Sequence, residues 1–223
     1  MELNPHDLLE VEGIGDLICY SSFPEWVEKS IAKAPFVVVR RARASEGLVS
    51  VGVRGSMRNE RFAAFLSVDH IVRRITPEQL AQERNWNEHS KEIFCCLERV
   101  SKLMNLHSLT WGPVGSVGFE LVSGKETTTK TSDIDIVIRF SEGFTTRFAR
   151  EIEAELKKIQ VRVDVQMEAM EGAFSLSEYA TLGGKTVLLR TMDGPMLMKI
   201  STLENGRTME RQKVKSFCLS VDS

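Results

Sequence analysis

Residues 132–138 read SDIDIVI and residues 161–166 read VRVDVQ, and these two short stretches decide the fold. In the first, isoleucines alternate with Asp133 and Asp135; in the second, valines alternate with polar residues that include Asp164. Strict alternation is typical of a strand with one buried face, and β-branched residues favour strands. Both stretches are therefore predicted to bury their aliphatic side chains and to present acids on the other face.

Paired carboxylates on one strand face point to a cation. Residues two apart on a strand share a face and lie about 6.6 Å apart along the chain. Carboxylates brought together and buried repel each other, and Mg²⁺ prefers oxygen ligands and keeps substrate phosphate in its coordination shell. We expect Asp133 and Asp135 to hold Mg²⁺, with Mn²⁺ as a substitute, and Asp164 to join them if its strand lies alongside. The competing interpretation is an exposed edge strand with two hydrated acids.

Gly115 and Ser116 supply the other half of a phosphate-binding site. Glycine lets the backbone approach a phosphate closely, and exposed N–H groups at a helix start bind anions. The Ser116 hydroxyl adds a possible donor. A polar loop, GFELVSGKETTTKT at residues 118–131, is expected to connect this pair to Ser132.

Hydrophobic periodicity predicts the remaining elements. Strands are expected at residues 36–40 and 48–53, joined as a hairpin, and a helix is expected to start at Pro77 with Thr76 as its N-cap. Longer amphipathic helices are expected at about residues 87–106 and 145–159. The change from strand-rich to helical sequence predicts a domain boundary near Arg84, giving an N-terminal domain of residues 1–84 and a catalytic domain of residues 85–223.

Composition limits the class of protein. The 223 residues are 42% hydrophobic and 27% charged with a net charge of −2, which is ordinary for a folded domain and argues against a general nucleic-acid binder. No apolar run approaches the ~18 residues needed to span a bilayer, and the first residues lack a signal peptide, so we expect a cytoplasmic protein without membrane contact. The cysteines have no metal-binding spacing and are expected to be reduced thiols: Cys19, Cys95, Cys96 and Cys218. Cys96 is expected in the core.

An ordered set of motifs carries a family resemblance. Gly-Ser, Asp-x-Asp and a later Asp resemble the signature of nucleotidyltransferases. The chain more closely resembles the phosphoribosyl-dephospho-CoA transferase of malonate decarboxylase, also called malonate decarboxylase holo-acyl-carrier-protein synthase. The motifs that carry the resemblance are His6-Asp7-Leu8-Leu9, residues 35–41, Val51-Gly52-Val53-Arg54 with Arg58 and Arg61, Gly115-Ser116, residues 132–135, Val163-Asp164-Val165-Gln166, residues 172–176 with Glu178-Tyr179, Leu189-Arg190-Thr191 and Gly194-Pro195.

The resemblance implies a fold and a reaction. The fold is α/β (α+β), with a nucleotidyltransferase-like mixed sheet flanked by helices and a smaller strand-rich N-terminal domain. The donor is triphosphoribosyl-dephospho-CoA, and the acceptor is a serine of the acyl-carrier subunit. The serine hydroxyl attacks the α-phosphorus, a phosphodiester forms and pyrophosphate leaves.

The resemblance also assigns roles to residues. The family's metal-binding aspartates fall on Asp133 and Asp135, and its donor-binding Gly-Ser falls on Gly115 and Ser116. Asp164 either binds a second metal ion or accepts the serine proton as general base. Ser132 lies next to the metal-binding pair and is expected to contact substrate. Basic side chains should meet the departing pyrophosphate, and the sequence does not rank Lys125, Lys130, Arg190 and Lys199 for that role.

A basic segment in the N-terminal domain suggests a partner surface. Residues 40–74 contain eight arginines and three acids, a local charge of +5. By family analogy an acidic carrier subunit would be attracted there. The alternatives are contacts with donor phosphates, where bidentate geometry favours arginine, or an ordinary solvated face. His6 and Asp7 are expected to make only local hydrogen bonds or a cap.

Two other functions remain open. The same site in a nucleotidyltransferase acts on another hydroxyl acceptor, such as a small molecule, a nucleotide or another protein. A non-catalytic binding module on a transferase scaffold is the second alternative, and the intact set of three aspartates argues against it. Fold alone does not decide between these functions.

Overall fold

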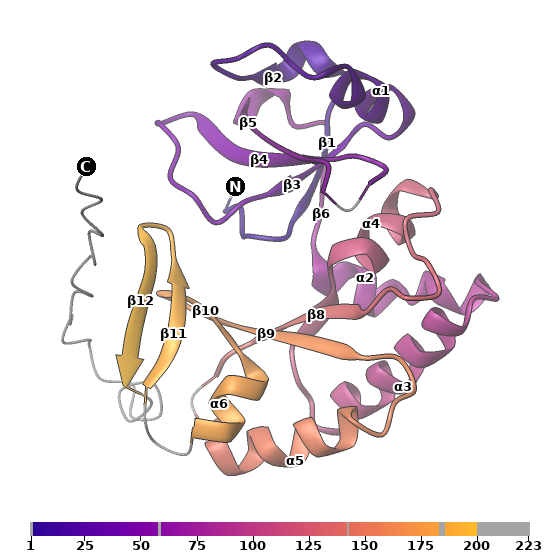
Figure 1. Cartoon of the computed structure of the whole chain (residues 1–223), viewed down its shortest axis with the longest axis vertical. Helices are drawn as coiled ribbons and strands as arrows, with labels where there is room; N and C mark the ends of the chain where they lie inside the picture. Colours follow the sequence, from indigo (N-terminus) through magenta and orange to yellow (C-terminus); the bar gives the residue numbers. More distant parts are fainter. Residues whose placement is uncertain (1, 58, 142, 183–185, 200–223) are drawn as a thin grey trace, which may run out of the picture.

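Two six-stranded sheets organise the chain (Figure 1). A computed structural model describes residues 2–57, 59–141, 143–182 and 186–199. Each sheet has its own hydrophobic core, one in the N-terminal part and a larger one in the C-terminal part. The α+β class and the smaller strand-rich N-terminal domain predicted from the sequence are confirmed.

The N-terminal sheet is antiparallel throughout its described pairings, in the order β2-β5-β4-β3-β1-β6. Its strands are β1 (Leu8–Glu10), β2 (Leu17–Ile18), β3 (Phe36–Val39), β4 (Leu48–Arg54), β5 (Arg61–Ser67) and β6 (Arg73–Ile75). Helix α1 (Glu25–Lys33) and the short turns η1 (Ile14–Asp16) and η2 (Val68–His70) complete this half. The predicted hairpin is confirmed, because Val38 pairs with Gly52 across β3 and β4.

The C-terminal sheet is mixed, in the order β12-β11-β10-β9-β8-β7. Its strands are β7 (Trp111–Pro113), β8 (Ile134–Arg139), β9 (Val163–Ala169), β10 (Gly172–Ser175), β11 (Thr186–Thr191) and β12 (Gly194–Lys199). The pair β8 and β9 runs parallel and the other described pairs run antiparallel. Parallel neighbours need a crossover, and α5 occupies the connection between them.

The helices pack mainly on the C-terminal sheet (Figure 1). They are α2 (Pro77–Glu83), η3 (Asn85–Glu88), α3 (Glu92–Leu106), α4 (Gly115–Ser123), α5 (Thr146–Leu156) and α6 (Leu176–Leu182). The predicted N-cap of α2 is confirmed: the Thr76 hydroxyl accepts the Gln79 N–H, and the Gln79 side chain accepts the Thr76 N–H. Thr145 caps α5 in the same way by accepting from Phe148 N.

The polar loop predicted from residue 118 is wrong for its first six residues, which belong to α4. Val117 and Phe119 are buried, so packing stabilises this helix although its glycines have a low helix propensity. Gly118 allows the close approach, because a Cβ at this position would lie 2.8 Å from the Pro113 carbonyl oxygen. The helix ends at Gly124, whose φ of +67° is the left-handed conformation usual after a helix.

The helix predicted at residues 87–106 begins later than expected. Residues 85–88 form a 3₁₀ turn, because Trp86 is buried there with its ring centroid 6.2 Å from that of Trp111. The regular helix starts at Glu92. Cys96 is buried as predicted, and Cys218 lies outside the described residues.

A third apolar cluster joins the two halves. Leu8, Phe36 and Ile75 of the N-terminal sheet pack with Leu80 of α2 and Phe119 of α4. Helix α2 also packs against β7, so it lies with the C-terminal sheet although it precedes the predicted domain boundary near Arg84. That boundary falls at the C-cap of α2 and stays a prediction.

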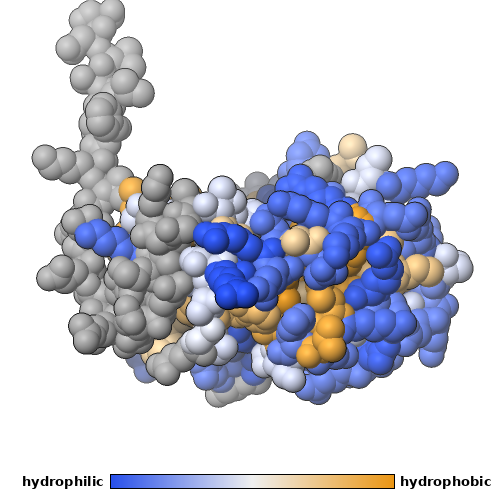
Figure 2. All heavy atoms as spheres, turned by 90° about the horizontal axis from the view of Figure 1, so that it is seen from below, coloured by the Kyte–Doolittle hydropathy of each residue, from blue (hydrophilic) through white to orange (hydrophobic). Residues whose placement is uncertain are grey.

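No helix in the described ranges is long and apolar enough to cross a membrane. Figure 2 shows one face, in which hydrophobic side chains reach the surface between larger hydrophilic areas. Exposed apolar atoms of this kind are usual on a protein surface.

Candidate active site

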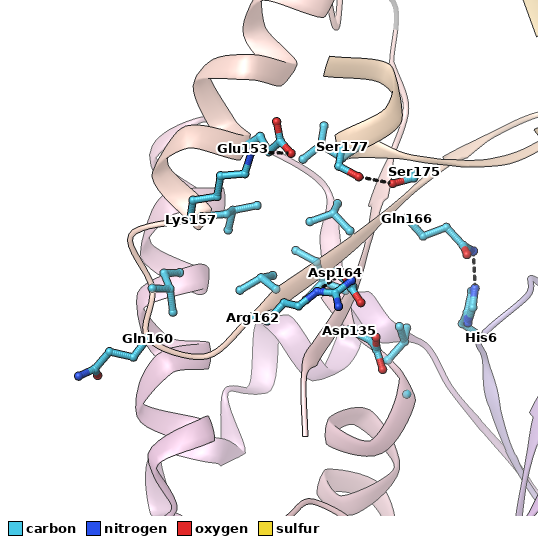
Figure 3. Close-up of a pocket in the computed structure, with 18 of the residues that line it drawn as sticks. His6, Asp135, Glu153, Lys157, Gln160, Arg162, Asp164, Gln166, Ser175 and Ser177 are labelled. Atoms are coloured by element: carbon cyan, nitrogen blue, oxygen red, sulfur yellow. Dashed lines mark hydrogen bonds and ion pairs between the residues drawn. The ribbon is translucent and has the colours of Figure 1, made fainter. Parts of the chain in front are cut away.

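Asp135 and Asp164 lie side by side on the parallel strands β8 and β9. They are register partners, and neighbouring strands are about 4.8 Å apart. Because partners in a parallel pair project to the same face, both carboxylates reach the same side of the sheet, as Figure 3 shows. The alternation that predicted both strands places their isoleucines and valines in or against the core beneath. The condition stated for Asp164, that its strand lies alongside that of Asp135, is therefore met.

Burial and neighbouring charges perturb the Asp135 carboxyl. Burial raises its pKa, and the negative charges of Asp164 and Asp133 raise it further, while Arg54 and His6 act in the opposite direction. Asp133 precedes β8 by one residue and contributes through its charge. The three carboxylates therefore create a region of excess negative potential that a bound cation would relieve.

The turn before α4 lies directly against Asp135. Gly115 has a φ of +61°, and a Cβ at this position would lie 2.1 Å from Asp135 Oδ2. Val114 N donates a hydrogen bond of 2.9 Å to the Asp135 carbonyl, which ties this turn to β8. The N-cap residue of α4, Val114, makes no side-chain cap, so the first N–H groups of this nine-residue helix retain capacity for an anion.

Arg162 partly neutralises the site. Its Nη2 lies 2.8 Å from Asp164 Oδ1, and the Arg162 side chain is largely exposed while that of Asp164 is half-exposed. The hydrogen bond to Asp164 and the negative charges of Asp164, Asp133 and Asp135 raise the pKa of Arg162. An exposed ion pair of this kind is weak enough to exchange for a phosphate or a metal ion.

Gly115, Asp135, Arg162 and Asp164 line a cavity of about 870 Å³, whereas Asp133 is not among its lining residues (Figure 3). Asp135 and Asp164 form one wall with Arg162, and Arg190, Ser175 and Ser177 lie around it. Its volume lies within the range of about 300–1,000 Å³ that is typical of small-molecule pockets.

His6 enters this cavity from the N-terminal half, although sequence reasoning had given it only a local role. His6 Nε2 lies 2.6 Å from Gln166 Nε2 and 3.5 Å from Glu168 Oε1, and Figure 3 shows the contact with Gln166. Its φ of +77° lies in the left-handed region, which is uncommon for residues other than glycine. The only sequence signal was its place in the His6-Asp7-Leu8-Leu9 motif. Its neighbour Asp7 accepts a local hydrogen bond from Asn4 N, but it also accepts one from Arg74 Nε on β6, so the expectation of only local contacts is wrong for Asp7.

Glu168 ties the N-terminal half to this wall. Arg41 Nη2 lies 2.5 Å from both carboxylate oxygens of Glu168. Burial alone would raise the pKa of Glu168, but hydrogen bonds from His6, Gln166 and Arg41 and the Arg41 charge outweigh it and lower the pKa to about 2. Part of the basic segment therefore serves as a structural clamp between the two halves.

The donor set fits a magnesium ion in its chemistry. Asp133 and Asp135 offer carboxylate oxygens, and Mg²⁺ is typically bound by one or two carboxylates with substrate phosphates filling other positions. Within the described ranges, no group of three or more His, Cys, Asp or Glu side chains is arranged to hold a metal ion by itself. A metal here would therefore depend on substrate oxygens as well as on the protein.

Family comparisons identify the chain. The model for the phosphoribosyl-dephospho-CoA transferase MdcG C-terminal domain matches residues 79–201, and the model for the MdcG N-terminal domain matches residues 4–77. The chain belongs to the phosphoribosyl-dephospho-CoA transferase family. The two models meet where β6 gives way to α2.

Curated relatives agree over most of the chain. The phosphoribosyl-dephospho-CoA transferase of Pseudomonas fluorescens Pf0-1 is 37% identical over 183 residues, covering 82% of this chain and 87% of the relative. Those of Pseudomonas syringae pv. tomato and Azotobacter vinelandii are 36% and 33% identical, each covering 87% of this chain and 90% and 92% of the relatives. No solved structure matches the chain.

The other residues predicted to bind substrate are Arg190, Ser116 and Ser132. Arg190 lines the cavity and donates to Gln166 at 3.4 Å. Ser116 is buried, and its carbonyl accepts from the Thr127 hydroxyl. The Ser132 hydroxyl accepts from Thr129 N, so it holds the loop before β8. Neither serine lines the cavity.

The three lysines considered for pyrophosphate also lie outside the walls of this cavity: Lys125, Lys130 and Lys199. Burial lowers the pKa of Lys125. Arg58 of the basic segment lies outside the described residues.

Proposed function

We propose that the chain transfers the phosphoribosyl-dephospho-CoA group from triphosphoribosyl-dephospho-CoA to a serine of the malonate decarboxylase acyl-carrier subunit. The observation that carries this proposal is the register pairing of Asp135 with Asp164 opposite the Gly115 turn, in a chain of this transferase family. Membership supports the transferred group. The acceptor and the magnesium ion are our inference.

The reaction exchanges one phosphoester bond for another. The serine oxygen forms a bond to the α-phosphorus, the bond between that phosphorus and the pyrophosphate oxygen breaks, and pyrophosphate leaves with the electron pair. When bound, a divalent cation at Asp133 and Asp135 neutralises charge on the phosphate oxygens. The exposed backbone N–H groups at the start of α4 orient the donor's phosphates.

Asp164 is suited to the acceptor side of the reaction. Its carboxylate is near Asp135 yet half-exposed, so a hydroxyl group can reach it. It either takes the serine proton or completes the coordination of a second cation. Arg162 holds it in position until substrate binds.

Three described cysteines are free thiols, which agrees with our proposal that the reaction takes place in the cytoplasm. A nucleotidyltransferase acting on another hydroxyl acceptor remains the alternative. Both use the same carboxylates, so the acceptor decides between them.

Pyrophosphate release tests the proposal. The full-length protein is mixed with Mg²⁺ and triphosphoribosyl-dephospho-CoA, with and without the apo-carrier subunit. We expect release only when the carrier is present, and its loss when the carrier's acceptor serine is replaced by alanine. Release with ATP or CTP and a small hydroxyl acceptor, at rates equal to or above those with the carrier, would instead support the alternative.

A further inference from the structure

A second cavity, of about 480 Å³, lies between the two halves of the molecule. It shares His6, Val114, Gly115 and Asp135 with the first cavity, so the two meet at the Gly115 turn. Apolar side chains from both halves form much of its wall, including Leu8, Leu80 and Phe119. Three arginines of the N-terminal sheet complete it: Arg40, Arg54 and Arg61.

Two of these arginines lie side by side on adjacent strands of the N-terminal sheet. Arg54 on β4 and Arg61 on β5 are direct partners in the antiparallel register, so their side chains project to the same face. Like charges in directly opposite positions destabilise a sheet. Gly52 lies two residues before Arg54 on that face, and the Arg40 side chain crosses it, with Cδ 3.4 Å from where a Cβ would be. The sheet therefore gathers three guanidinium groups on one face, where Arg40 Nη1 donates to the Ser50 hydroxyl and Arg61 Nη1 donates to the Glu60 carbonyl.

Arg54 is the most desolvated of the three. Its Nε is buried and has no hydrogen-bond partner among the described residues. Burial lowers its pKa, the positive charge of Arg61 lowers it further, and the charge of Asp135 acts in the opposite direction. A buried donor without a partner destabilises the folded protein, and a ligand that supplies acceptor oxygens removes that destabilisation.

The positions of the two cavities match the geometry of phosphoryl transfer. The attacking and leaving oxygens lie roughly in line on opposite sides of the phosphorus. Asp164 lines the first cavity, and the arginines line the second, with Asp135 and Gly115 common to both. A donor whose α-phosphorus lies at Asp135 can therefore extend its leaving group towards the arginines while the acceptor enters beside Asp164.

We propose that Arg40, Arg54 and Arg61 form a polyphosphate cradle that binds the pyrophosphate portion of the donor. This inference rests on the proposed function and adds that the N-terminal domain neutralises the leaving group. Guanidinium groups bind phosphate oxygens bidentately, and they stabilise the electron pair that the pyrophosphate takes with it. The serine proton departs on the other side, towards the carboxylates of the first cavity.

Direct binding of inorganic tripolyphosphate tests the cradle without donor or carrier. Isothermal titration calorimetry on the full-length protein should show binding that weakens at least tenfold in Arg54→Gln and in Arg61→Gln. Arg43→Gln is the matched control, since Arg43 belongs to the same basic segment but pairs with the exposed Asp193. The control should bind as the wild type does. Ligand-free Arg54→Gln should unfold at a temperature equal to or above that of the wild type, because the variant removes a buried Nε that has no hydrogen-bond partner among the described residues and relieves the repulsion from Arg61.

The outcomes separate this inference from the proposed function. Equal binding by wild type and both cradle variants, or no binding by wild type, overturns the cradle even if the carrier is still modified. Binding that depends on Arg54 and Arg61 supports the cradle, including in a protein that fails to modify the carrier. A lowered unfolding temperature in Arg54→Gln would mark Arg54 as a structural residue and would also overturn the cradle.

Discussion

Replacing Gly115 with alanine should disable transfer by displacing Asp135. The new Cβ would lie 2.1 Å from Asp135 Oδ2 and 3.0 Å from its Cβ, so the carboxylate has to withdraw by roughly 1 Å or more. Misplacing a reacting group by about 1 Å costs on the order of 10²-fold in rate. Gly115 also has a φ of +61°, which costs a side-chain-bearing residue about 1–2 kcal/mol.

Gly47→Ala separates these two effects. Gly47 has a φ of +77°, and a Cβ there meets nothing within 4 Å. The positive φ should therefore lower the free energy of unfolding of each variant by about 1–2 kcal/mol, measured by urea denaturation. Only Gly115→Ala should lose transfer, followed as pyrophosphate release with donor and carrier.

Transfer at the wild-type rate in both glycine variants would refute this reasoning. Asp135 would then have no need of the position that the Gly115 turn imposes. A loss of transfer in Gly47→Ala as large as that in Gly115→Ala would refute it equally, because the effect would follow from strain alone.

Three further predictions concern the carboxylates, the clamp and the domain junction. Asp133→Asn and Asp135→Asn should each reduce the transfer rate by on the order of 10²-fold, whereas the control Asp193→Asn, at an exposed ion pair, should not. Chelation with EDTA should stop transfer and added Mg²⁺ should restore it, so turnover that persists in EDTA would contradict the metal assignment. The folded-state pKa of Glu168 is about 2 against 4.5 for a free glutamate, so its ionised form stabilises the folded protein by about 3 kcal/mol above pH 4.5, and this contribution is lost as the pH falls towards 2. Glu168→Gln should therefore flatten the dependence of the unfolding free energy on pH over that range, measured by urea denaturation. An unchanged slope of that dependence would exclude the clamp. Phe119→Ala should lower the free energy of unfolding by about 3–5 kcal/mol because it empties the cluster that joins the two halves, and a thermal or urea unfolding curve matching the wild type would show that the cluster does not hold them together.

Local patterns were enough to predict the strands that carry the acids. The alternation around Asp135 and around Asp164 predicted β8 and β9, and the helical pattern between them is consistent with a parallel crossover. The Thr76 cap was equally local, since it depends on a hydroxyl and a glutamine three residues apart. Features with a short sequence period were therefore accessible without a structure.

Features that depend on distant contacts were not accessible in this way. The α4 helix has glycines that lower helix propensity, and the burial of Val117 in the C-terminal core and of Phe119 against the N-terminal half stabilises it. His6 contacts Gln166 and Glu168, which lie far from it in the sequence, and no periodicity indicates such contacts. The Arg54 and Arg61 pairing depends on the register of two strands, and the sequence shows only a surplus of arginines.

The intact mass of the carrier subunit tests the proposed transfer most directly. After incubation with the full-length protein, Mg²⁺ and triphosphoribosyl-dephospho-CoA, the apo-carrier should gain the mass of one phosphoribosyl-dephospho-CoA group on a single serine. With Asp135→Asn in place of the wild type it should gain none over the same time. A carrier of unchanged mass with the wild type, or one modified equally by Asp135→Asn, would contradict the account.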